Sequence, residues 1–180
     1  MKHKNIPFSP PDMSEDEINE VADTLRNGWI TTGPKVKEFE RQIAEFVGVN
    51  KAVCLNSQTA CAEMALRVLG VGEGDEVIVP ANTYIASILA ITENNLVPVL
   101  VEPDIKTFEI DDYDALEKAI TEKTKVIIPV DLGGVPCDYD RIYEIIEKKK
   151  HLFKPSNKIQ EAMGRISVNA DTAHAFGASW

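Results

Sequence analysis

The residues best suited to chemistry lie in short segments that are far apart in the sequence. Asp171 follows the apolar run "ISVNA", and His174 comes three residues later. The segment "NSQTA" places Ser57 and Thr59 between an apolar run and a helical pattern. Hydroxyls beside the free amides of a helix N-terminus suit a phosphate group, although either residue could serve only as a helix cap. An Asp at a strand end is usually a cap and a lone His usually structural, so no segment identifies a site alone.

Two further segments follow expected strands. In "PANTYIAS", Tyr84 enters a helical pattern, where a flat aromatic ring could stack on a planar ligand or simply belong to the core. In "DLGGVPCDYD", Gly133 and Gly134 permit tight turns. Asp138 or Asp140 is expected to cap the next helix, so we assign this pair a structural role.

The joint occurrence of these segments is more informative than any one of them. A phosphate cradle, a planar aromatic and a later strand-end acid are the parts needed to hold pyridoxal 5′-phosphate. The carboxylate would keep the pyridine nitrogen protonated, so that the ring can accept electrons from a substrate carbanion. The sequence therefore predicts a site for this cofactor.

The elements that must position these residues alternate along the chain. Nearly continuous apolar, β-branched runs indicate strands buried on both faces, and strand–helix alternation predicts an α/β fold with a mainly parallel sheet flanked by helices. Ligands of such sheets bind outside the carboxyl ends of the strands. The expected strands are residues 51–55, 76–80, 97–102, 125–130 and 166–170, and the expected helices are residues 59–70, 83–95, 112–120 and 138–150.

Two helices are expected before this alternating core. Ser14 and Glu17 form a capping box for the first, which ends near Asn27 and Gly28. Pro34 suits the first turn of the second, and Gly48 ends it. We therefore divide the chain into N-terminal helices at residues 1–48 and a core at 49–180. An insertion at about 148–165 interrupts the core and is expected to be a mobile loop or lid, with a short helix after Ser156.

Composition narrows the function classes. The net charge is −10, which argues against binding nucleic acid as a main role. No apolar run is long enough to span a bilayer, and the N-terminus lacks a signal-peptide core, so a membrane role is not expected. The cysteines Cys54, Cys61 and Cys137 are odd in number and lack metal-site spacing. They indicate reduced thiols in a cytoplasmic protein.

The chain resembles the DegT/StrS family of pyridoxal-phosphate sugar aminotransferases, of fold type I, along nearly all its length. The resemblance is carried by "GWITTGPKVKEFE", "NSQTACAEMAL", "GDEVIVPANTYIAS", "GGVPCDYDRI" and "ADTAHAFGA", in the family's order and spacing. It departs from the family at Gln58, where many relatives have Gly, and at residues 151–165, where the link is usually shorter.

The resemblance implies a role for each matching residue. Ser57, Gln58 and Thr59 would contact the cofactor phosphate, and Tyr84 would stack on the pyridine ring. Asp171 would pair with the ring nitrogen. His174 would lie near the 3-oxygen of the ring. Thr31 and Thr32 would lie near the substrate or the cofactor edge.

The family reaction moves an amino group from glutamate to a keto-sugar attached to a nucleotide. Both half-reactions need a lysine, which forms the Schiff base and then transfers protons. In the family it lies downstream of the Asp, but only nine residues follow Asp171 here and none is Lys. We therefore expect a partial large domain of a longer protein, without the C-terminal small domain and without a catalytic residue for transamination. We expect it to be inactive alone and to bind the cofactor weakly.

Alternative functions stay open at this stage. A sugar dehydratase of the same family uses His in place of the lysine, and a silent binding or regulatory homologue could retain the fold. A nicotinamide-binding protein is disfavoured, because no GxGxxG follows the first expected strand. Family members are dimers with shared active sites, so the resemblance implies a homodimer.

Overall fold

The computed structural model describes residues 7, 9–104 and 112–179. The chain divides into two compact units, with the boundary in the sequence between Cys54 and Leu55. We describe each unit separately.

The N-terminal unit contains two helices whose ends follow the sequence signals. Helix α1 spans Glu15–Asn27, begins with the Ser14–Glu17 capping box and ends at Gly28, which has a φ of 68°. Helix α2 spans Pro34–Phe46 with proline at its first turn. Lys35 pairs with the carboxylates of Glu20 and Asp23 and so ties the two helices together.

The apolar faces of these helices are largely exposed. No residue of α1 is buried, and its Ile18, Val21 and Leu25 are each more than half exposed. Phe39 and Phe46 of α2 are likewise exposed, whereas the sequence periodicity indicates a face for burial. The charged face of α2 is well paired: the Arg41 guanidinium donates to Glu38 and lowers the pKa of that carboxyl to about 2.

The second unit is built on a parallel sheet of four strands in the order β2-β1-β3-β4. The strands are β1 (Glu76–Pro80), β2 (Val97–Val101), β3 (Thr124–Ile127) and β4 (Ser167–Val168). Each follows its predecessor through a helical crossover, as parallel strands require. The expected parallel sheet is therefore present.

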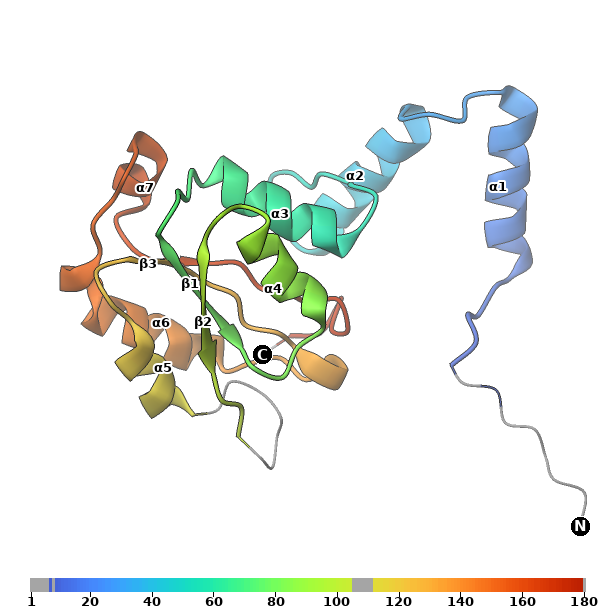
Figure 1. Cartoon of the computed structure of the whole chain (residues 1–180). Coiled ribbons are helices and arrows are strands. Elements are labelled where there is room, and N and C mark those ends of the chain that lie inside the picture. The colour runs from blue at the N-terminus through green and yellow to red at the C-terminus, as the bar shows by residue number, and fades with distance from the viewer. Residues whose placement is uncertain (1–6, 8, 105–111, 180) are drawn as a thin grey trace, which may run out of the picture. The chain divides into compact units, whose positions relative to one another are not determined.

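Helices cover both faces of this sheet. They are α3 (Gln58–Val68), α4 (Ile85–Thr92), α5 (Tyr113–Ala119), α6 (Tyr139–Lys148) and α7 (Lys158–Met163), with short 3₁₀ turns at Leu132–Gly134 and Lys150–Leu152. Helices α3 and α4 pack on one face and α5 and α6 on the other (Figure 1). Alternation along β1 supplies both cores: Val77 and Val79 face α3 and α4, and Ile78 faces α5 and α6.

One expected strand is not formed. Residues 51–55 carry an apolar pattern but are assigned no strand, and they find no strand partner among the described residues. A strand needs a hydrogen-bonded neighbour as well as a suitable sequence, so this prediction was wrong. The last strand is weaker than expected, with two residues instead of five.

The insertion is anchored rather than free. Its helix α7 follows Ser156 as expected, but the Gln160 side chain is buried and donates to the carbonyls of Leu69 and Gly70, at the end of α3. Lys125 holds the carbonyl of Lys154. These contacts place the segment at the amino ends of the strands, and its expected mobility stays a prediction.

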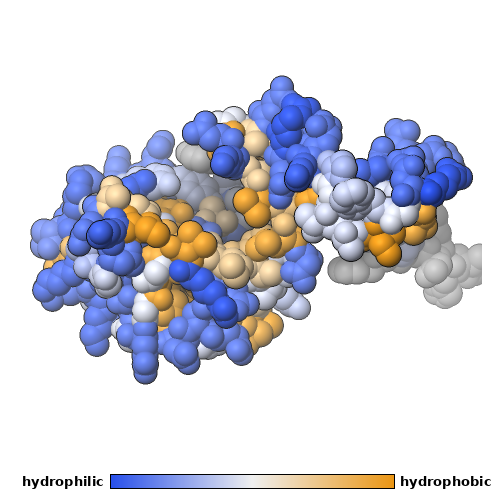
Figure 2. Space-filling model, turned by 90° about the horizontal axis from the view of Figure 1, so that it is seen from above, coloured by the Kyte–Doolittle hydropathy of each residue, from blue (hydrophilic) through white to orange (hydrophobic). Residues whose placement is uncertain are grey.

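The surface of the second unit carries exposed apolar side chains. Figure 2 shows apolar residues gathered in patches of an otherwise hydrophilic surface. Exposed apolar residues of the unit include Tyr84, the N-cap residue of α4, and Ile85 and Leu89 within that helix. No helix among the described residues is long and apolar enough to cross a membrane. No disulfide bond joins Cys54, Cys61 or Cys137 in the described part of the chain.

Candidate functional site

Asp171 is held by its backbone on both sides. Its N–H donates to the carbonyl of Pro129 at 2.8 Å, and its carbonyl accepts from the N–H of Asp131 at 3.0 Å. These bonds form a parallel bridge with Val130, just beyond the end of β3. The apolar run before Asp171 therefore continues sheet-like pairing as far as the acid, which places the acid at the carboxyl edge of the sheet.

The carboxylate of Asp171 is buried and partly satisfied. Its Oδ2 accepts from the hydroxyl of Ser87 at 3.1 Å, and its Oδ1 accepts from the backbone N–H of Ala173 at 3.3 Å. A carboxylate offers about four acceptor positions. No further donor to this carboxylate is found among the described residues, which leaves it acceptor capacity for a ligand.

That cavity has a volume of about 250 Å³ and contains most of the predicted site. It is bounded by the start of α3, the segment before α4, the residues after β3 and the loop after Asp171. The lining residues are Gln58, Thr59, Thr83, Tyr84, Val130, Leu132, Asp171, Ala173 and His174. The fold thus brings Gln58, Thr59, Tyr84, Asp171 and His174 around one cavity.

Ser57 does not line the cavity but shapes its wall. It is the N-cap of α3, and its Oγ accepts from the N–H of Ala60 at 3.1 Å. Ser57 therefore caps the helix, which was one of the two roles that its position in the sequence allowed. The next two amides, of Gln58 and Thr59, have no partner within the described part of the chain. They stand at the positive end of the helix dipole, which suits an anionic group.

His174 has a defined hydrogen-bond partner. Its Nδ1 accepts from the backbone N–H of Gly133 at 3.2 Å. In a neutral imidazole the other nitrogen then carries the proton, so Nε2 is the donor. Gly133 has a φ of 66°, a left-handed conformation that glycine adopts without steric cost.

Tyr84 lies one residue before α4 rather than inside it. It is the N-cap residue, and 78% of it is exposed. The ring lines the cavity without being packed into the core, so the core interpretation weighed at the sequence level is excluded. Its stacking role stays a prediction.

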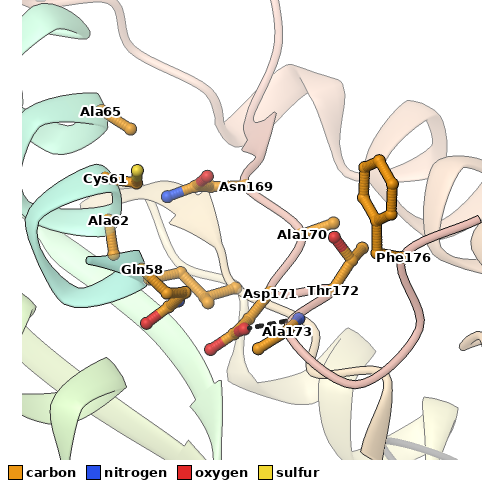
Figure 3. A pocket seen from close by; sticks show the side chains of 11 residues that line it. Gln58, Cys61, Ala62, Ala65, Asn169, Ala170, Asp171, Thr172, Ala173 and Phe176 are labelled. Carbon is orange, nitrogen blue, oxygen red and sulfur yellow. Dashed lines mark hydrogen bonds between the residues drawn. The ribbon is translucent and has the colours of Figure 1, made fainter. Parts of the chain in front are cut away.

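A second cavity adjoins Asp171 on its other side. It has a volume of about 440 Å³ and lies between α3 and the segment that follows β4. Figure 3 shows the Asn169 side chain directed toward Cys61 and Ala65 on α3, with Gln58 beside the Asp171 carboxylate. Asp171 and Gln58 line both cavities.

Thr31 and Thr32 belong to the N-terminal unit. With Trp29, Gly33 and Pro34 they line a separate cavity of about 600 Å³. The Trp29 indole N–H donates to the Thr32 carbonyl at 3.2 Å. Their role near a substrate stays a prediction.

The sequence analysis missed the residues that support the site from behind. Ser87 lies 84 positions from Asp171, and nothing local marks it as a partner. Asp131 is also buried, and it accepts from the Tyr139 hydroxyl and from the N–H of Cys137. The sequence signals that could have pointed to a buried acid at Asp131 were the apolar strand before it and the helix cap at Asp138 after it. Burial raises the pKa of Tyr139, and its hydrogen bond to Asp131 raises it further.

Comparisons with known proteins agree with this geometry. The sequence model of the DegT/DnrJ/EryC1/StrS aminotransferase family matches residues 11–180, so the chain belongs to this family. Over all 180 residues it is 39% identical to the UDP-4-amino-4-deoxy-L-arabinose–oxoglutarate aminotransferase of Shewanella sediminis and covers 42% of that protein. Over 142 residues it is 41% identical to the spore coat polysaccharide biosynthesis protein SpsC of Bacillus subtilis, covering 79% of this chain and 36% of that one.

Solved structures show the same relationship. The pyridoxal-phosphate form of Spr1654 from Streptococcus pneumoniae, assigned as a sugar aminotransferase, is 59% identical with a TM-score of 0.94. The match covers 97% of this chain and 44% of that one. The chain thus spans less than half the length of these relatives. The predicted family and fold class are confirmed, and the cofactor of this class is pyridoxal phosphate, as predicted.

The described site fits that cofactor in its donor and acceptor chemistry. The cavity has amide and hydroxyl donors at one helix end for a phosphate, an exposed aromatic ring for a flat heterocycle, and a buried carboxylate with open acceptor positions for a ring N–H. The lysine that the family needs does not occur among the nine residues after Asp171.

Proposed function

We propose that this chain forms the cofactor-binding part of an aminotransferase that moves an amino group from glutamate to a nucleotide-linked keto-sugar. The single observation that carries the proposal is the shared cavity, in which Thr59, Tyr84, Asp171 and His174 meet at the carboxyl edge of the sheet. The names of the relatives support the reaction class, since one is an oxoglutarate aminotransferase of an amino-sugar nucleotide. Polysaccharide or secondary-metabolite sugar biosynthesis is the proposed setting.

Each part of the cavity has a separate task in this proposal. The amides of Gln58 and Thr59, with the Thr59 hydroxyl, bind the phosphate. The Tyr84 ring covers one face of the heterocycle. Asp171 holds a proton on the ring nitrogen, because its buried carboxylate favours a cationic partner. Bound pyridoxal phosphate supplies an electron sink for the substrate carbon that loses its proton.

His174 completes the ring contacts in this proposal. Gly133 occupies its Nδ1, which leaves the protonated Nε2 to donate to an oxygen on the ring. The backbone hydrogen bonds of Asp171 to Pro129 and Asp131 fix the position of the acid. The hydrogen bond from Gly133 orients the imidazole of His174, so both groups are in place before a ligand binds. Such preorganisation lowers the ordering cost of binding.

The 180 residues alone are proposed to bind the cofactor noncovalently and not to transaminate. No lysine follows Asp171 in this sequence to form the Schiff base or to carry the proton. Turnover of glutamate and a nucleotide-linked keto-sugar by the purified chain with pyridoxal phosphate would contradict this part of the proposal.

The cofactor proposal is tested by an absorbance titration of the purified chain with pyridoxal phosphate. We expect saturable binding, weakened about tenfold or more by Asp171→Asn, which removes the charge but keeps the shape. Asp140→Asn is the matched control, because Asp140 is exposed on α6. Equal binding by the Asp171→Asn variant and the unmodified chain would overturn the assignment of the acid.

A sugar dehydratase is the second candidate. A structure of GDP-4-keto-6-deoxymannose-3-dehydratase matches with a TM-score of 0.82 at 26% identity, which keeps this chemistry within the same fold. The two activities differ in the residue that takes the lysine's place. Sequencing the gene beyond codon 180 decides between them, since a Lys supports transamination and a His supports dehydration.

The protein is further proposed to act as a cytoplasmic homodimer. The lack of a disulfide bond among the described cysteines supports a reducing compartment. The exposed stripe of Ile18, Val21 and Leu25 on α1 and the exposed Ile85 and Leu89 on α4 supply apolar surface for a partner subunit. Light scattering coupled to size-exclusion chromatography should give twice the chain mass. A monomer at micromolar concentration would contradict the dimer.

A further inference from the structure

A line of three polar side chains runs behind the cavity. Thr83, in the segment before α4, lies 3.2 Å from Ser87 between their hydroxyl oxygens, and Ser87 donates to Asp171 at 3.1 Å. Ser87 is 1% exposed and Asp171 is 8% exposed. Thr83 lines the same cavity as Asp171. The line therefore begins and ends at the cavity wall and passes through the protein interior between these points.

The direction of the hydrogen bonds follows from proton counting. A carboxylate only accepts, so the single hydroxyl proton of Ser87 points to Asp171. The oxygen of Ser87 is then an acceptor for Thr83, which must donate to it. Thr83 thus fixes the rotamer of Ser87, and Ser87 fixes one oxygen of the carboxylate.

We infer that Ser87 is a positioning residue that aims the Asp171 carboxylate at the cofactor's ring nitrogen, with Thr83 holding Ser87 in place. This inference rests on the proposed function of the cavity. The other bond to the carboxylate, from the Ala173 N–H, is longer at 3.3 Å and comes from the same loop as the acid. Ser87 belongs to helix α4, so its hydrogen bond ties the direction of the carboxylate to the core of the fold rather than to the loop that contains Asp171 and Ala173.

A purely structural Ser87 would behave differently from a positioning one. Removing a structural hydroxyl would weaken the binding of any ligand shape that fits the cavity. Removing a positioning hydroxyl would weaken mainly the contact between Asp171 and a ring N–H. Ligand pairs that differ only at the ring nitrogen separate these cases without measuring activity.

The experiment titrates the full 180-residue chain with pyridoxal phosphate and with its analogue that has carbon in place of the ring nitrogen. We expect the unmodified chain to prefer pyridoxal phosphate by about tenfold or more, the usual worth of a charge-assisted hydrogen bond. Ser87→Ala should reduce this preference to about threefold or less, and Thr83→Val should reduce it partially. Thr92→Ala, at an exposed position of the same helix, is the control and should leave it unchanged.

Each result has one meaning. An unchanged preference in Ser87→Ala, or an equal loss for both ligands, would overturn the inference while leaving the cofactor site intact. Absence of binding by the unmodified chain would overturn the proposed function and the inference with it. Far-UV circular dichroism checks that each variant folds. If Ser87→Ala does not fold, the preference measured for Thr83→Val decides the matter.

Discussion

The backbone N–H of Gly133 donates to Nδ1 of His174 across 41 positions of sequence, at 3.2 Å. This bond joins the turn after β3 to the loop after Asp171, and it selects the tautomer of the imidazole. The consequence is a donor at Nε2 of neutral His174, at the cavity that the histidine lines.

The first prediction concerns this tautomer. A long-range nitrogen–proton NMR spectrum of the neutral imidazole should show the proton on Nε2. His174→Phe should weaken pyridoxal phosphate binding several-fold, because it removes the donor while keeping an aromatic ring. His151→Phe, at an exposed position of the insertion, is the control. A proton on Nδ1 would contradict the assigned geometry.

The second prediction concerns the phosphate end of the cavity. Thr59→Val keeps the shape of the side chain but removes its hydroxyl, and we expect it to weaken binding of pyridoxal phosphate by about five- to tenfold. Pyridoxal, which lacks the phosphate, should bind both proteins equally. A loss of the same size for both ligands would show that Thr59 acts on the cavity shape and not on the phosphate.

The third prediction concerns the buried pair of Tyr139 and Asp131. Tyr139→Phe should lower the free energy of unfolding by about 1–3 kcal/mol at pH 8, because the carboxylate loses a buried donor. Urea denaturation measures this. Tyr143→Phe is the control, since Tyr143 lies on the same helix and is 37% exposed. Equal stability of the two variants would show that the Tyr139 hydroxyl contributes nothing.

The same pair should give stability a dependence on pH. The folded state raises the pKa of Tyr139 above its usual value of about 10, so the neutral hydroxyl is favoured by folding. Its contribution is complete below pH 10 and is lost as the pH rises further. The stability advantage over Tyr139→Phe should therefore shrink in denaturation curves above pH 10, and a constant difference would contradict the assignment.

The fourth prediction separates the insertion from the cavity. Gln160→Met should destabilise the protein by about 1–2 kcal/mol, because it removes a buried amide that donates to the carbonyls of Leu69 and Gly70 and accepts from the N–H of Ser156, while Asn157 still donates to both carbonyls. It should leave pyridoxal phosphate affinity unchanged, because the 11 residues of α3 separate these carbonyls from the cavity by roughly 16 Å. Glu161→Gln is the exposed control. Weakened cofactor binding would support the prediction that the insertion acts as a lid.

Sequence patterns anticipated those parts of the fold that depend on local signals. The Ser14 capping box, Pro34 and Gly28 mark helix ends correctly, because caps act within a few residues. The four strands that formed are mostly apolar runs with hydrogen-bonded neighbours in the sheet, and the central strands β1 and β3 are more buried than β2 and β4 at the edges. Residues 51–55 failed for want of a partner strand among the described residues, which no local pattern reveals.

For the candidate site, too, local sequence signals identified some residues and missed those that depend on distant contacts. Tyr84 follows β1 and Asp171 and His174 follow β4, so the rule that ligands bind at the carboxyl edge pointed to them, whereas Thr59 was chosen for its place at the start of a helix, after an expected strand that did not form. Ser87 was missed because its role depends on a hydrogen bond across 84 positions. The contacts of the insertion were not anticipated, because its polar composition resembles a free loop, whereas the Gln160 side chain donates to backbone carbonyls far away in sequence.

The backbone bonds that join Asp171 to Pro129 and Asp131 bear on how this scaffold can be redesigned. Since main-chain atoms fix the backbone position of the acid, neighbouring side chains other than Ser87 and Thr83 can be exchanged without displacing it. Libraries that vary Leu132, Ala173 or Asn169 should keep the acid in register while reshaping the walls around it. Such tolerance allows new ligand preferences to be selected on one unchanged acidic anchor.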